Sequence, residues 1–446
     1  MKILLIAPPK DEEDISLFTL DDYSIKARSN QHPLGIMYLH SYLKPFHDVK
    51  IFDMNALELP ISAIKDEIES FKPDMVGITQ VIGKVVTVRK LAQEIKKYSS
   101  AKICLGGQNA SLYPWENLQW PYFDFVISGF GQIPLKELCD ALENNLDTDN
   151  INRVYTKNNC KEKIQGTFEF VNVDDFPIPD RSILPIENYQ MPFAPENPCT
   201  SMITSLGCPF HCGFCASRNY KPVTLRSPEN IVAEMKHIES LGVKSVMFQD
   251  ELFTMNIHRI NAICSLIIKE NVKLHWSVRS RANLVNPESL ALMRAAGCWN
   301  VHLGIESGTN RILGEMNKKL DVDLIEMSVN AIKSAGLKCT GSFMIGYPDE
   351  TKVEIFATIQ FAKKLQLDVS QFYYTAPEPN TPLYKKLKSI KNLPEDIYSD
   401  FTLNPDSVDL KNNIASTIFT KKELESFLEL AYSQTRNLYN IKRDNP

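Results

Sequence analysis

The chain alternates short apolar segments with amphipathic segments, and this alternation runs through residues 1–145 with few residues left over. Short apolar strands separated by amphipathic helices are typical of a parallel sheet that helices cover on both faces. The expected strands are residues 2–7, 49–54, 74–79, 101–107 and 123–129, and the expected helices are residues 34–46, 60–71, 84–98 and 132–144.

This pattern predicts the α/β class, with a flavodoxin-like (Rossmann-type) parallel-sheet domain over residues 1–150. Ligands of such folds bind beyond the carboxyl ends of the strands. Glycines at those ends let the backbone approach a ligand closely, although they can equally serve only to make tight turns. The candidate binding residues at the strand ends are Thr79, Gln80, Gly106, Gly107, Gln108, Gly129, Gly131 and Gln132.

The regular alternation stops between residues 151 and 200. Residues 151–173 are compatible with a small hairpin. Six prolines then fall within residues 174–200, too many for regular secondary structure. We therefore expect residues 151–200 to be a hairpin and a linker between two domains.

The alternation resumes at residue 201. Ser227-Pro228 and Asn286-Pro287 each supply an N-cap followed by proline at the first helical position. Six strand–helix units predict a partial (β/α)6 TIM-like barrel over residues 201–390, followed by a small helical region at 391–446. The expected strands are residues 201–206, 244–249, 273–279, 299–305, 338–345 and 368–375.

Three cysteines lie together in the segment GCPFHCGFCASRNY, residues 207–220. Cys208, Cys212 and Cys215 follow the first barrel strand, so they lie at the carboxyl-end face where barrel active sites are built. Three thiolates can hold three corners of a 4Fe-4S cluster and leave one iron open, whereas structural zinc needs four protein ligands. Only His211 or Cys199 could supply a fourth zinc ligand.

Other polar residues follow the later barrel strands and reach the same face. They are Asp250 and Glu251 after the second strand, Arg279 and Arg281 after the third, Glu306 after the fourth, and Gly346 after the fifth. Each carboxylate alone is more often a helix cap or a surface charge. Their convergence with a metal-binding loop predicts a catalytic site at this face.

Composition excludes several classes of protein. The formal net charge of −5 gives no general attraction to nucleic acid, and no apolar run reaches the length of a membrane span. The opening segment MKILLIAPPKDEED lacks the features of a signal peptide, and ten cysteines in 446 residues are not dense enough for a disulfide framework. We expect a cytoplasmic protein with no nucleic-acid partner and no membrane association.

The cysteine spacing C-x3-C-x2-C, with Phe214 before the last cysteine, resembles the hallmark of the radical S-adenosylmethionine superfamily. The similarity continues through LGIESGTNRIL (303–313), GSFMIGYPDET (341–351) and APEPNTPLY (376–384). The resemblance implies that the open iron binds S-adenosylmethionine. One electron, from a flavodoxin- or ferredoxin-type donor, then cleaves it to methionine and a 5′-deoxyadenosyl radical that abstracts a substrate hydrogen.

The resemblance also implies roles for individual residues. QDE replaces the family's more common Gly-Gly-Glu at residues 249–251. The implied contacts are Asp250 and Glu251 to the methionine amine, Lys318 or Arg281 to its carboxylate, Glu306 and Ser342 to the ribose, and Phe214 and Gly346 to the adenine.

The amino-terminal domain resembles the cobalamin-binding domain that precedes many radical barrels. The similarity lies in HPLGIMYLHSYL (32–43), DMVGIT (74–79), GGQNAS (106–111) and VISGFGQIPLKEL (126–138). None of the eight histidines lies in a D-x-H-x-x-G pattern, so bound cobalamin is expected without a protein nitrogen below the cobalt. Phe130 and Gln132 stand where the relatives usually have glutamates.

Together these features predict a cobalamin-dependent radical S-adenosylmethionine methyltransferase that acts on an unactivated carbon of a small molecule. One alternative is an enzyme of the same architecture that cyclises, rearranges or oxidises its substrate, or whose amino-terminal domain holds no cofactor. Another alternative, from a different class, is a non-catalytic binding module stabilised by a metal.

Overall fold

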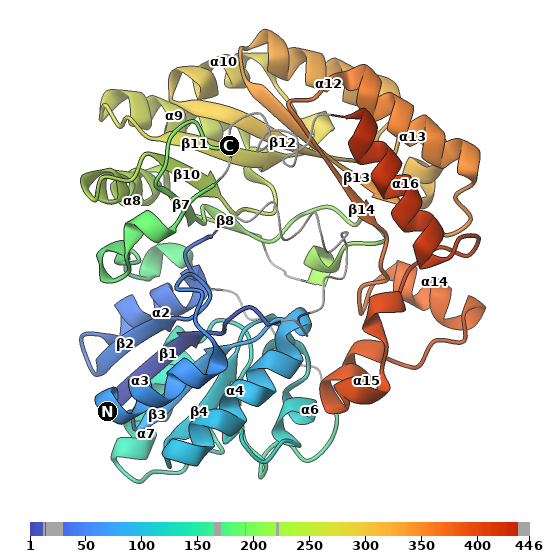
Figure 1. Cartoon of the computed structure of the whole chain (residues 1–446). Coiled ribbons are helices and arrows are strands. Elements are labelled where there is room, and N and C mark those ends of the chain that lie inside the picture. Colours follow the sequence, from blue (N-terminus) through green and yellow to red (C-terminus); the bar gives the residue numbers. More distant parts are fainter. Residues whose placement is uncertain (12–13, 15–29, 165–170, 192, 220–222, 436–446) are drawn as a thin grey trace. The chain divides into compact units, whose positions relative to one another are not determined.

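The chain folds into two compact units (Figure 1). The computed structural model describes residues 1–11, 14, 30–164, 171–191, 193–219 and 223–435. Of these, unit 1 takes those within Met1–Ile15, His32–Asn188 and Asp396–Lys411, and unit 2 takes those within Ser16–Gln31, Tyr189–Glu395 and Asn412–Pro446. The expected carboxy-terminal region at 391–446 is therefore shared between the two units.

Unit 1 is built on a six-stranded sheet with the order β2-β1-β3-β4-β5-β6. The first five strands pair in parallel in the flavodoxin order, which confirms the predicted fold class. The strands are β1 (Lys2–Ala7), β2 (Asp48–Asp53), β3 (Met75–Thr79), β4 (Lys102–Gly106), β5 (Phe125–Ile127) and β6 (Val154–Tyr155).

Strand β6 differs from the sequence expectation for residues 151–173. It pairs antiparallel with β5 and extends the sheet, and it forms no hairpin with the other described residues of this segment. Residues 165–170 of the expected hairpin lie outside the described residues.

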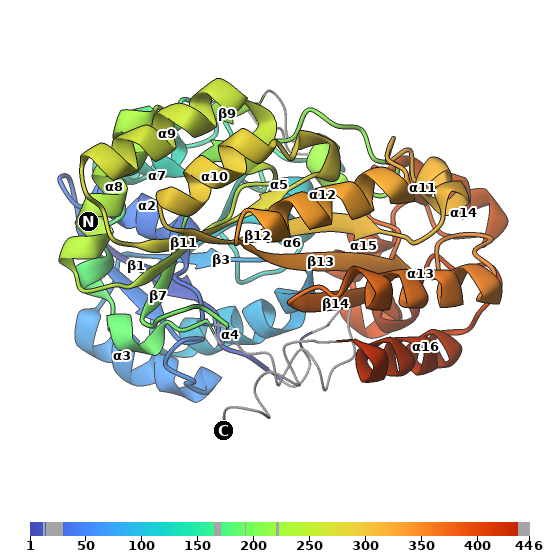
Figure 2. The same cartoon turned by 90° about the horizontal axis from the view of Figure 1, so that it is seen from above.

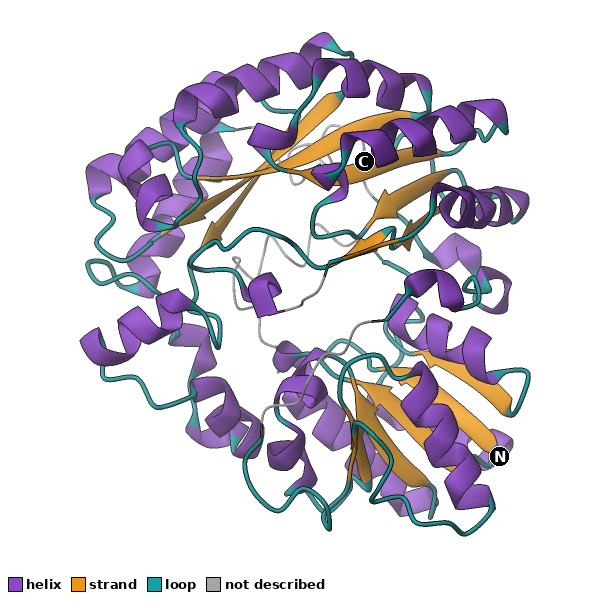
Figure 3. Ribbon diagram, turned by 180° about the vertical axis from the view of Figure 1, so that it is seen from behind, coloured by secondary structure: helices purple, strands orange, loops and turns teal. Residues whose placement is uncertain are grey.

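Helices cover both faces of the unit 1 sheet (Figure 3). Helix α3 packs beside α4, and α2 packs beside α7. The helices are α2 (Leu34–Leu43), α3 (Ile64–Phe71), α4 (Val85–Tyr98), α5 (Gln108–Leu112), α6 (Pro114–Leu118), α7 (Gln132–Glu143) and α15 (Ile397–Leu403). The strands are buried by helices on both sides, which accounts for the short and almost wholly apolar strand segments in the sequence.

Unit 2 is built on a six-stranded parallel sheet with the order β7-β10-β11-β12-β13-β14. The sheet is curled, and it has the number and order of strands predicted for a partial barrel. The strands are β7 (Cys199–Met202), β10 (Ser245–Phe248), β11 (His275–Ser280), β12 (Cys298–Glu306), β13 (Lys338–Ile345) and β14 (Val369–Tyr374).

The helices of unit 2 lie along the outer side of the curled sheet (Figure 2). Those that return the chain between strands are α8 (Pro228–Ser240), α9 (Ile257–Lys269), α10 (Pro287–Ala295), α11 (Asn310–Glu315), α12 (Val322–Ser334) and α13 (Lys352–Leu365). Helices α14 (Pro382–Ile390) and α16 (Lys421–Gln434) follow the last strand. None of the helices in the described part of the chain combines the length and apolar character of a membrane span.

The helix boundaries follow the predicted caps. The Ser227 side chain accepts a hydrogen bond from the Asn230 amide, and the Asn286 side chain accepts one from the Ser289 amide. Both caps satisfy amides that would otherwise lack a partner in the first helical turn. A capping box formed by Thr420 and Glu423 opens α16.

Helix α16 covers the free edge of the unit 2 sheet. The Tyr432 hydroxyl donates to the Phe372 carbonyl oxygen at 2.9 Å and accepts from the Phe372 amide at 3.1 Å. These bonds take up the backbone groups that an edge strand would otherwise expose. The part of the carboxy-terminal region within 412–435 therefore completes the barrel unit.

Candidate active site

The carboxyl ends of β3 and β4 bring four predicted binding residues together in unit 1. The Gln80 amide donates to the Gly106 carbonyl at 2.8 Å. Gly107 has a φ of +96°, and a Cβ there would lie 2.8 Å from the Gln80 carbonyl oxygen and 2.9 Å from the Thr79 hydroxyl. Only glycine fits this close approach of the two strand ends.

Two glutamines at this edge have side-chain atoms without partners. Gln80 is fully buried, and neither its Nε2 nor its Oε1 atom has a hydrogen-bond partner in the described part of the chain. Gln132, at the start of α7, has a buried Oε1 atom that also has no hydrogen-bond partner in the described residues. Buried polar atoms are almost always hydrogen-bonded, so an edge with three orphaned amide atoms fits a ligand rich in uncharged polar groups. The amide-bearing corrin ring of cobalamin is such a ligand.

The remaining predicted residues of this edge lie on the loops that begin α5 and α7. The Ser111 hydroxyl donates to the Gly107 carbonyl at 2.8 Å and accepts from the Gly129 amide at 2.9 Å, which ties the two loops together. Gln108 is the first residue of α5, and Gly131 is the N-cap of α7.

A segment that sequence reasoning assigned elsewhere supports these loops. Within unit 1, the Asn109 side chain donates to the Thr402 hydroxyl at 2.9 Å, and the Ser399 hydroxyl donates to Glu116 at 2.6 Å. The Tyr113 hydroxyl bonds Asp396 at 3.0 Å. Residues 396–411 thus fix α5 and α6 beside the glycine loop. No periodicity in the sequence separates them from the rest of the tail.

In unit 2, backbone hydrogen bonds hold the cysteine loop in place. The Gly213 amide donates to the Met316 carbonyl at 2.8 Å, and the Gly213 carbonyl accepts from the Leu383 amide at 3.0 Å. The Asn317 side chain donates to the His211 carbonyl at 2.9 Å. These contacts anchor the backbone and leave the thiols of Cys208, Cys212 and Cys215 as the reactive groups of the loop.

The donor set of the loop fits an iron–sulfur cluster. Among the described residues, the one three-ligand group whose donor atoms all lie within 4.8 Å is His47, Asp140 and Glu143 in unit 1. At least two of the three sulfurs are therefore more than 4.8 Å apart, whereas two sulfurs that each lie about 2.3 Å from one zinc ion can be at most about 4.6 Å apart. Three separated thiolates suit three corners of a larger cluster.

Arg281 faces the thiols. Its Nη1 atom lies 3.6 Å from the Cys212 sulfur, and its guanidinium stacks 4.2 Å from the Phe210 ring centroid. Burial raises the pKa of the Cys208 and Cys215 thiols, and the Arg281 charge opposes this rise at Cys208. The structure thus places Arg281 beside the thiols. Its contact with the methionine carboxylate, for which Lys318 is the alternative, stays a prediction.

Glu306 and Lys318 form a buried ion pair with an Nζ–Oε1 distance of 2.7 Å. Glu306 has a φ of +71°, which is rare for a residue other than glycine and often marks a functional site. A Cβ on Gly304 would lie 2.6 Å from the Glu306 carboxylate, so glycine there makes room for the pair. The Lys318 ammonium also lies 5.8 Å from the Phe214 ring centroid, which brings three predicted site residues together.

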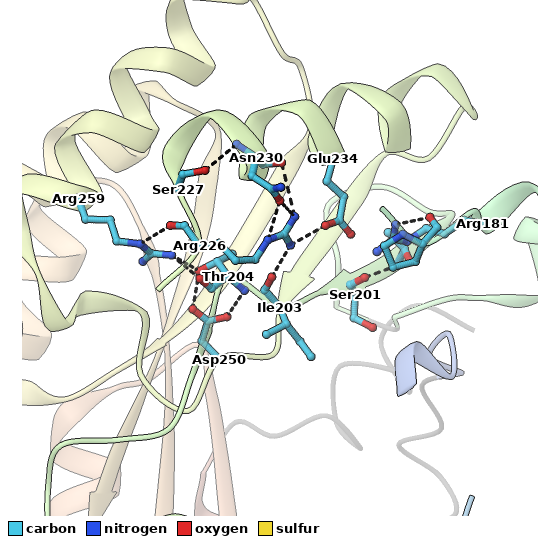
Figure 4. A network of polar contacts seen from close by, with 12 residues as sticks. Arg181, Ser201, Ile203, Thr204, Arg226, Ser227, Asn230, Glu234, Asp250 and Arg259 are labelled. Atoms are coloured by element: carbon cyan, nitrogen blue, oxygen red, sulfur yellow. Dashed lines mark hydrogen bonds and ion pairs between the residues drawn. The ribbon is translucent and has the colours of Figure 1, made fainter. Parts of the chain in front are cut away.

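Asp250 is buried, and both of its carboxylate oxygens already accept hydrogen bonds (Figure 4). Its carboxylate accepts from the Thr204 amide at 2.6 Å, from the Thr204 hydroxyl at 2.5 Å and from the Ser205 hydroxyl at 2.6 Å. Its exposed fraction is 0%. Because the Asp250 carboxylate is buried and bonded within the protein, the structure does not show it free for the expected contact with the methionine amine. Glu251 is exposed, accepts from Ser217 at 2.7 Å, and lies near enough to Cys208 and Cys215 for its charge to raise their pKa.

Two buried arginines complete the network under the loop (Figure 4). The Arg259 Nη2 atom donates to the Thr204 carbonyl at 2.5 Å, and the Arg226 Nη1 atom donates to the Ile203 carbonyl at 2.6 Å. Arg226 also pairs with Glu234 at 2.6 Å. Sequence reasoning missed these residues, because an arginine on a helix or beside an N-cap carries no sign of burial.

The last predicted residues lie on and after β13. The Ser342 hydroxyl lies 2.6 Å from the His302 Nε2 atom. The Gly346 amide donates to Glu350 at 2.6 Å, and a Cβ on Gly346 would lie 2.8 Å from Leu424 of α16. Gly346 is thus fixed between a buried carboxylate and α16.

Comparisons with known proteins agree with both units. Residues 202–362 match the family model of the radical SAM superfamily, and residues 21–139 match that of the B12-binding domain. An uncharacterized methyltransferase of Pyrococcus horikoshii is 34% identical over 97% of this chain and 92% of its own length. The anaerobic magnesium-protoporphyrin IX monomethyl ester cyclase of Rubrivivax gelatinosus is 24% identical over 80% of this chain and 66% of its own.

A solved structure has a similar fold. It is the radical S-adenosylmethionine methyltransferase TsrM of Kitasatospora setae, with cobalamin and a [4Fe-4S] cluster bound. Its TM-score is 0.71 at 17% identity, covering 87% of this chain and 78% of that one. At this identity the similarity concerns the fold alone, and it covers most of both unit 1 and unit 2.

The Asp250 network generates a prediction with an adjacent control. Asp250→Ala leaves three buried donors unsatisfied, so we expect the free energy of unfolding to fall by about 3 kcal/mol or more. Glu251→Ala removes an exposed carboxylate and should change stability by about 0.5 kcal/mol or less, while weakening S-adenosylmethionine binding. Anaerobic urea unfolding and equilibrium dialysis measure the two effects. A stable Asp250→Ala protein with weakened binding would restore the amine contact to Asp250.

Glu350 generates a prediction about pH. Burial raises its pKa from 4.5 to about 7. Between these values the folded chain holds a proton that the unfolded chain has lost, so the free energy of unfolding falls as pH rises through this window. In Glu350→Gln this decline should be smaller, and in the exposed control Glu429→Gln it should be unchanged. Urea unfolding at about pH 5 and about pH 8 tests this. An equal decline in all three proteins would contradict it.

Proposed function

This chain belongs to the radical S-adenosylmethionine enzymes that carry a B12-binding domain, and we propose that it methylates an unactivated carbon of a small molecule. The observation that supports this most strongly is the pairing, in one chain, of a three-thiol loop and an edge with orphaned amide atoms on Gln80 and Gln132. The Pyrococcus relative, a methyltransferase by name, supports the same reaction.

In this proposal Cys208, Cys212 and Cys215 hold a 4Fe-4S cluster. When bound and reduced, the cluster supplies the electron that cleaves S-adenosylmethionine, and cobalamin supplies the methyl carrier. Glu251 accepts from the methionine amine, and Lys318 donates to its carboxylate. Charge-assisted bonds of both signs suit this zwitterion. The Arg281 charge favours the thiolate form of Cys208, because it opposes the rise in pKa that burial causes there.

Other residues orient the nucleoside. Glu306 is fixed by Lys318 at 2.7 Å and is proposed to contact the ribose together with Ser342. Phe214 and the Gly346 turn are proposed to flank the adenine. Asp250 has a supporting role, because its oxygens are already bonded to Thr204 and Ser205.

The strand-end residues of unit 1 are proposed to bind cobalamin. Gln80 and Gln132 would bond the amide side chains of the corrin ring, which satisfies their orphaned atoms. Glycine backbone gives the ring close access to the sheet edge. The proposed contacts are Thr79, Gln80, Gly106, Gly107, Gln108, Gly129, Gly131 and Gln132.

A one-electron donor must reach the cluster. A hollow of about 370 Å³ adjoins the cysteine loop, and its lining includes His211, Gly213, Asn317, Leu383 and Lys386. His211 and Lys386 are exposed there, and Lys386 pairs with Glu315, which also lines the hollow, at 3.2 Å. We propose that a small electron carrier of the flavodoxin or ferredoxin type docks at this face, in the reducing cytoplasm, where an oxygen-sensitive cluster survives.

The products of turnover test the reaction. Anaerobically reconstituted protein with cobalamin and [methyl-13C]S-adenosylmethionine is incubated with a small-molecule extract of its host. We expect one metabolite to gain a labelled methyl group, with S-adenosylhomocysteine and 5′-deoxyadenosine released in comparable amounts. One S-adenosylmethionine donates the methyl group, and a second takes up the displaced substrate hydrogen as 5′-deoxyadenosine.

A matched pair of variants controls for fold. Cys212→Ala should abolish 5′-deoxyadenosine, whereas Cys264→Ala, at a buried cysteine outside the loop, should form it. Formation of 5′-deoxyadenosine with substrate consumption but without S-adenosylhomocysteine would reject methyl transfer. That outcome would favour cyclisation or oxidation, as the name of the Rubrivivax relative suggests.

A further inference from the structure

The inner face of the unit 2 sheet carries a row of polar side chains of which the proposed reaction uses only Ser342. On β11, Trp276 and Val278 are buried, whereas Arg279 is exposed. Because side chains alternate along a strand, Arg279 and Ser277 point to the opposite face from Trp276. Trp276 stacks on Phe248 in the core beneath the outer helices, so Arg279 lies on the inner face.

The neighbouring strands continue this polar row. Arg279 is the register partner of His302 on β12. The His302 Nε2 atom lies 2.6 Å from the Ser342 hydroxyl on β13, and Ser342 is the register partner of Gln371 on β14. The Tyr373 hydroxyl donates to the Gln371 Oε1 atom at 3.0 Å. The side chains of three strands therefore form a connected wall beside the arginine.

Arg279 is the charged group of this wall. It has no hydrogen bond or ion pair to any residue that the structure describes. Burial and the Arg279 charge lower the pKa of His302 to about 3, so the imidazole is neutral at physiological pH. Glu306, the predicted site carboxylate on β12, is already paired with Lys318. A cation on the inner face of a barrel without a protein counter-charge is suited to an anionic ligand.

Apolar side chains lie next to this polar row. Met247 on β10 is the register partner of Ser277, one inward position before Arg279. Met247 and Phe193 pack against the buried cluster of Met191, Cys199 and Trp299. A ligand at Arg279 would therefore have an apolar surface next to its charged group.

We infer that the substrate of this enzyme carries an anionic group, a carboxylate or a phosphate, which Arg279 binds beside an apolar portion packed on Met247 and its cluster. This inference rests on the proposed function, because it assigns a substrate class to the same barrel. The competing ligand is the carboxylate of S-adenosylmethionine. Two cations lie beside residues of the predicted cluster loop, Lys318 beside Phe214 and Arg281 beside Cys212. Arg279 comes two residues before Arg281, so it lies about 7 Å farther from the cysteine loop along the strand.

Fluorine NMR tests the inference without requiring turnover. The probes are 4-fluorobenzoate, 4-fluorophenyl phosphate and the neutral 4-fluorobenzamide, each added to reconstituted protein with S-adenosylmethionine bound. We expect at least one anion to bind about tenfold more tightly than the amide. Arg279→Gln should remove that preference and Arg279→Lys should retain part of it. Arg294→Gln, at an exposed arginine of α10, should leave it unchanged.

The affinity for S-adenosylmethionine, measured by equilibrium dialysis, separates the two ligands. Unchanged affinity in Arg279→Gln, with the anion preference lost, supports a substrate site. Affinity reduced tenfold or more would overturn the inference and assign Arg279 to the methionine carboxylate. Equal binding of anions and amide by the unmodified protein would also overturn it. These results leave the proposed methyl transfer intact, since that fails only on its products.

Discussion

The buried carboxylate of Asp250 is the interaction on which the cluster site depends. It bonds the Thr204 amide and the hydroxyls of Thr204 and Ser205, where the chain leaves the first barrel strand for the cysteine loop. Arg259 and Arg226 hold the carbonyls of Thr204 and Ile203 from the other side. A loop that must present three thiols to a cluster needs a rigid base, and buried charge-assisted bonds supply one.

The two units offer chemically different ligand surfaces. Unit 1 presents glycine backbone and uncharged glutamine amides, and the buried side-chain amide of Gln80 has no hydrogen-bond partner among the residues that the structure describes. Unit 2 presents charge: thiols opposed by Arg281, the Glu306–Lys318 pair, and Arg279 on the inner face. A large neutral cofactor rich in amides suits the first surface, and a zwitterionic cosubstrate with an anionic substrate suits the second. Both surfaces lie at strand ends or on inner strand faces, where parallel sheets leave room for ligands.

Local sequence signals were enough to predict the strands, the crossover helices and their caps. Ser227, Asn286 and Thr420 act within a few residues of themselves, so their pattern is visible in the chain. The radical and cobalamin motifs placed the site for the same reason. Contacts between distant segments were not visible, and they account for the errors. Residues 396–411 join unit 1 through Thr402 and Ser399, and β6 pairs with β5 in place of the expected hairpin.

The role of Asp250 shows the limit of arguing from a motif. Its position next to Glu251 predicted two ligand-binding carboxylates, but the structure shows that Asp250 is buried and that both of its oxygens bond within the protein. Arg279 shows the converse, because only the placement of the neighbouring strands shows that it has no hydrogen bond or ion pair within the described part of the chain. Sequence spacing gives the position of a side chain along a strand, but the packing around that side chain determines whether it bonds within the protein or is available to a ligand.

We expect Cys208, Cys212 and Cys215 to hold a cluster with one iron open to S-adenosylmethionine. Mössbauer spectroscopy of protein reconstituted with 57Fe tests it most directly. Adding S-adenosylmethionine should shift the signal of one iron out of about four and leave the others unchanged, since only the open iron gains ligands. Four equivalent irons that do not respond to S-adenosylmethionine would contradict the account.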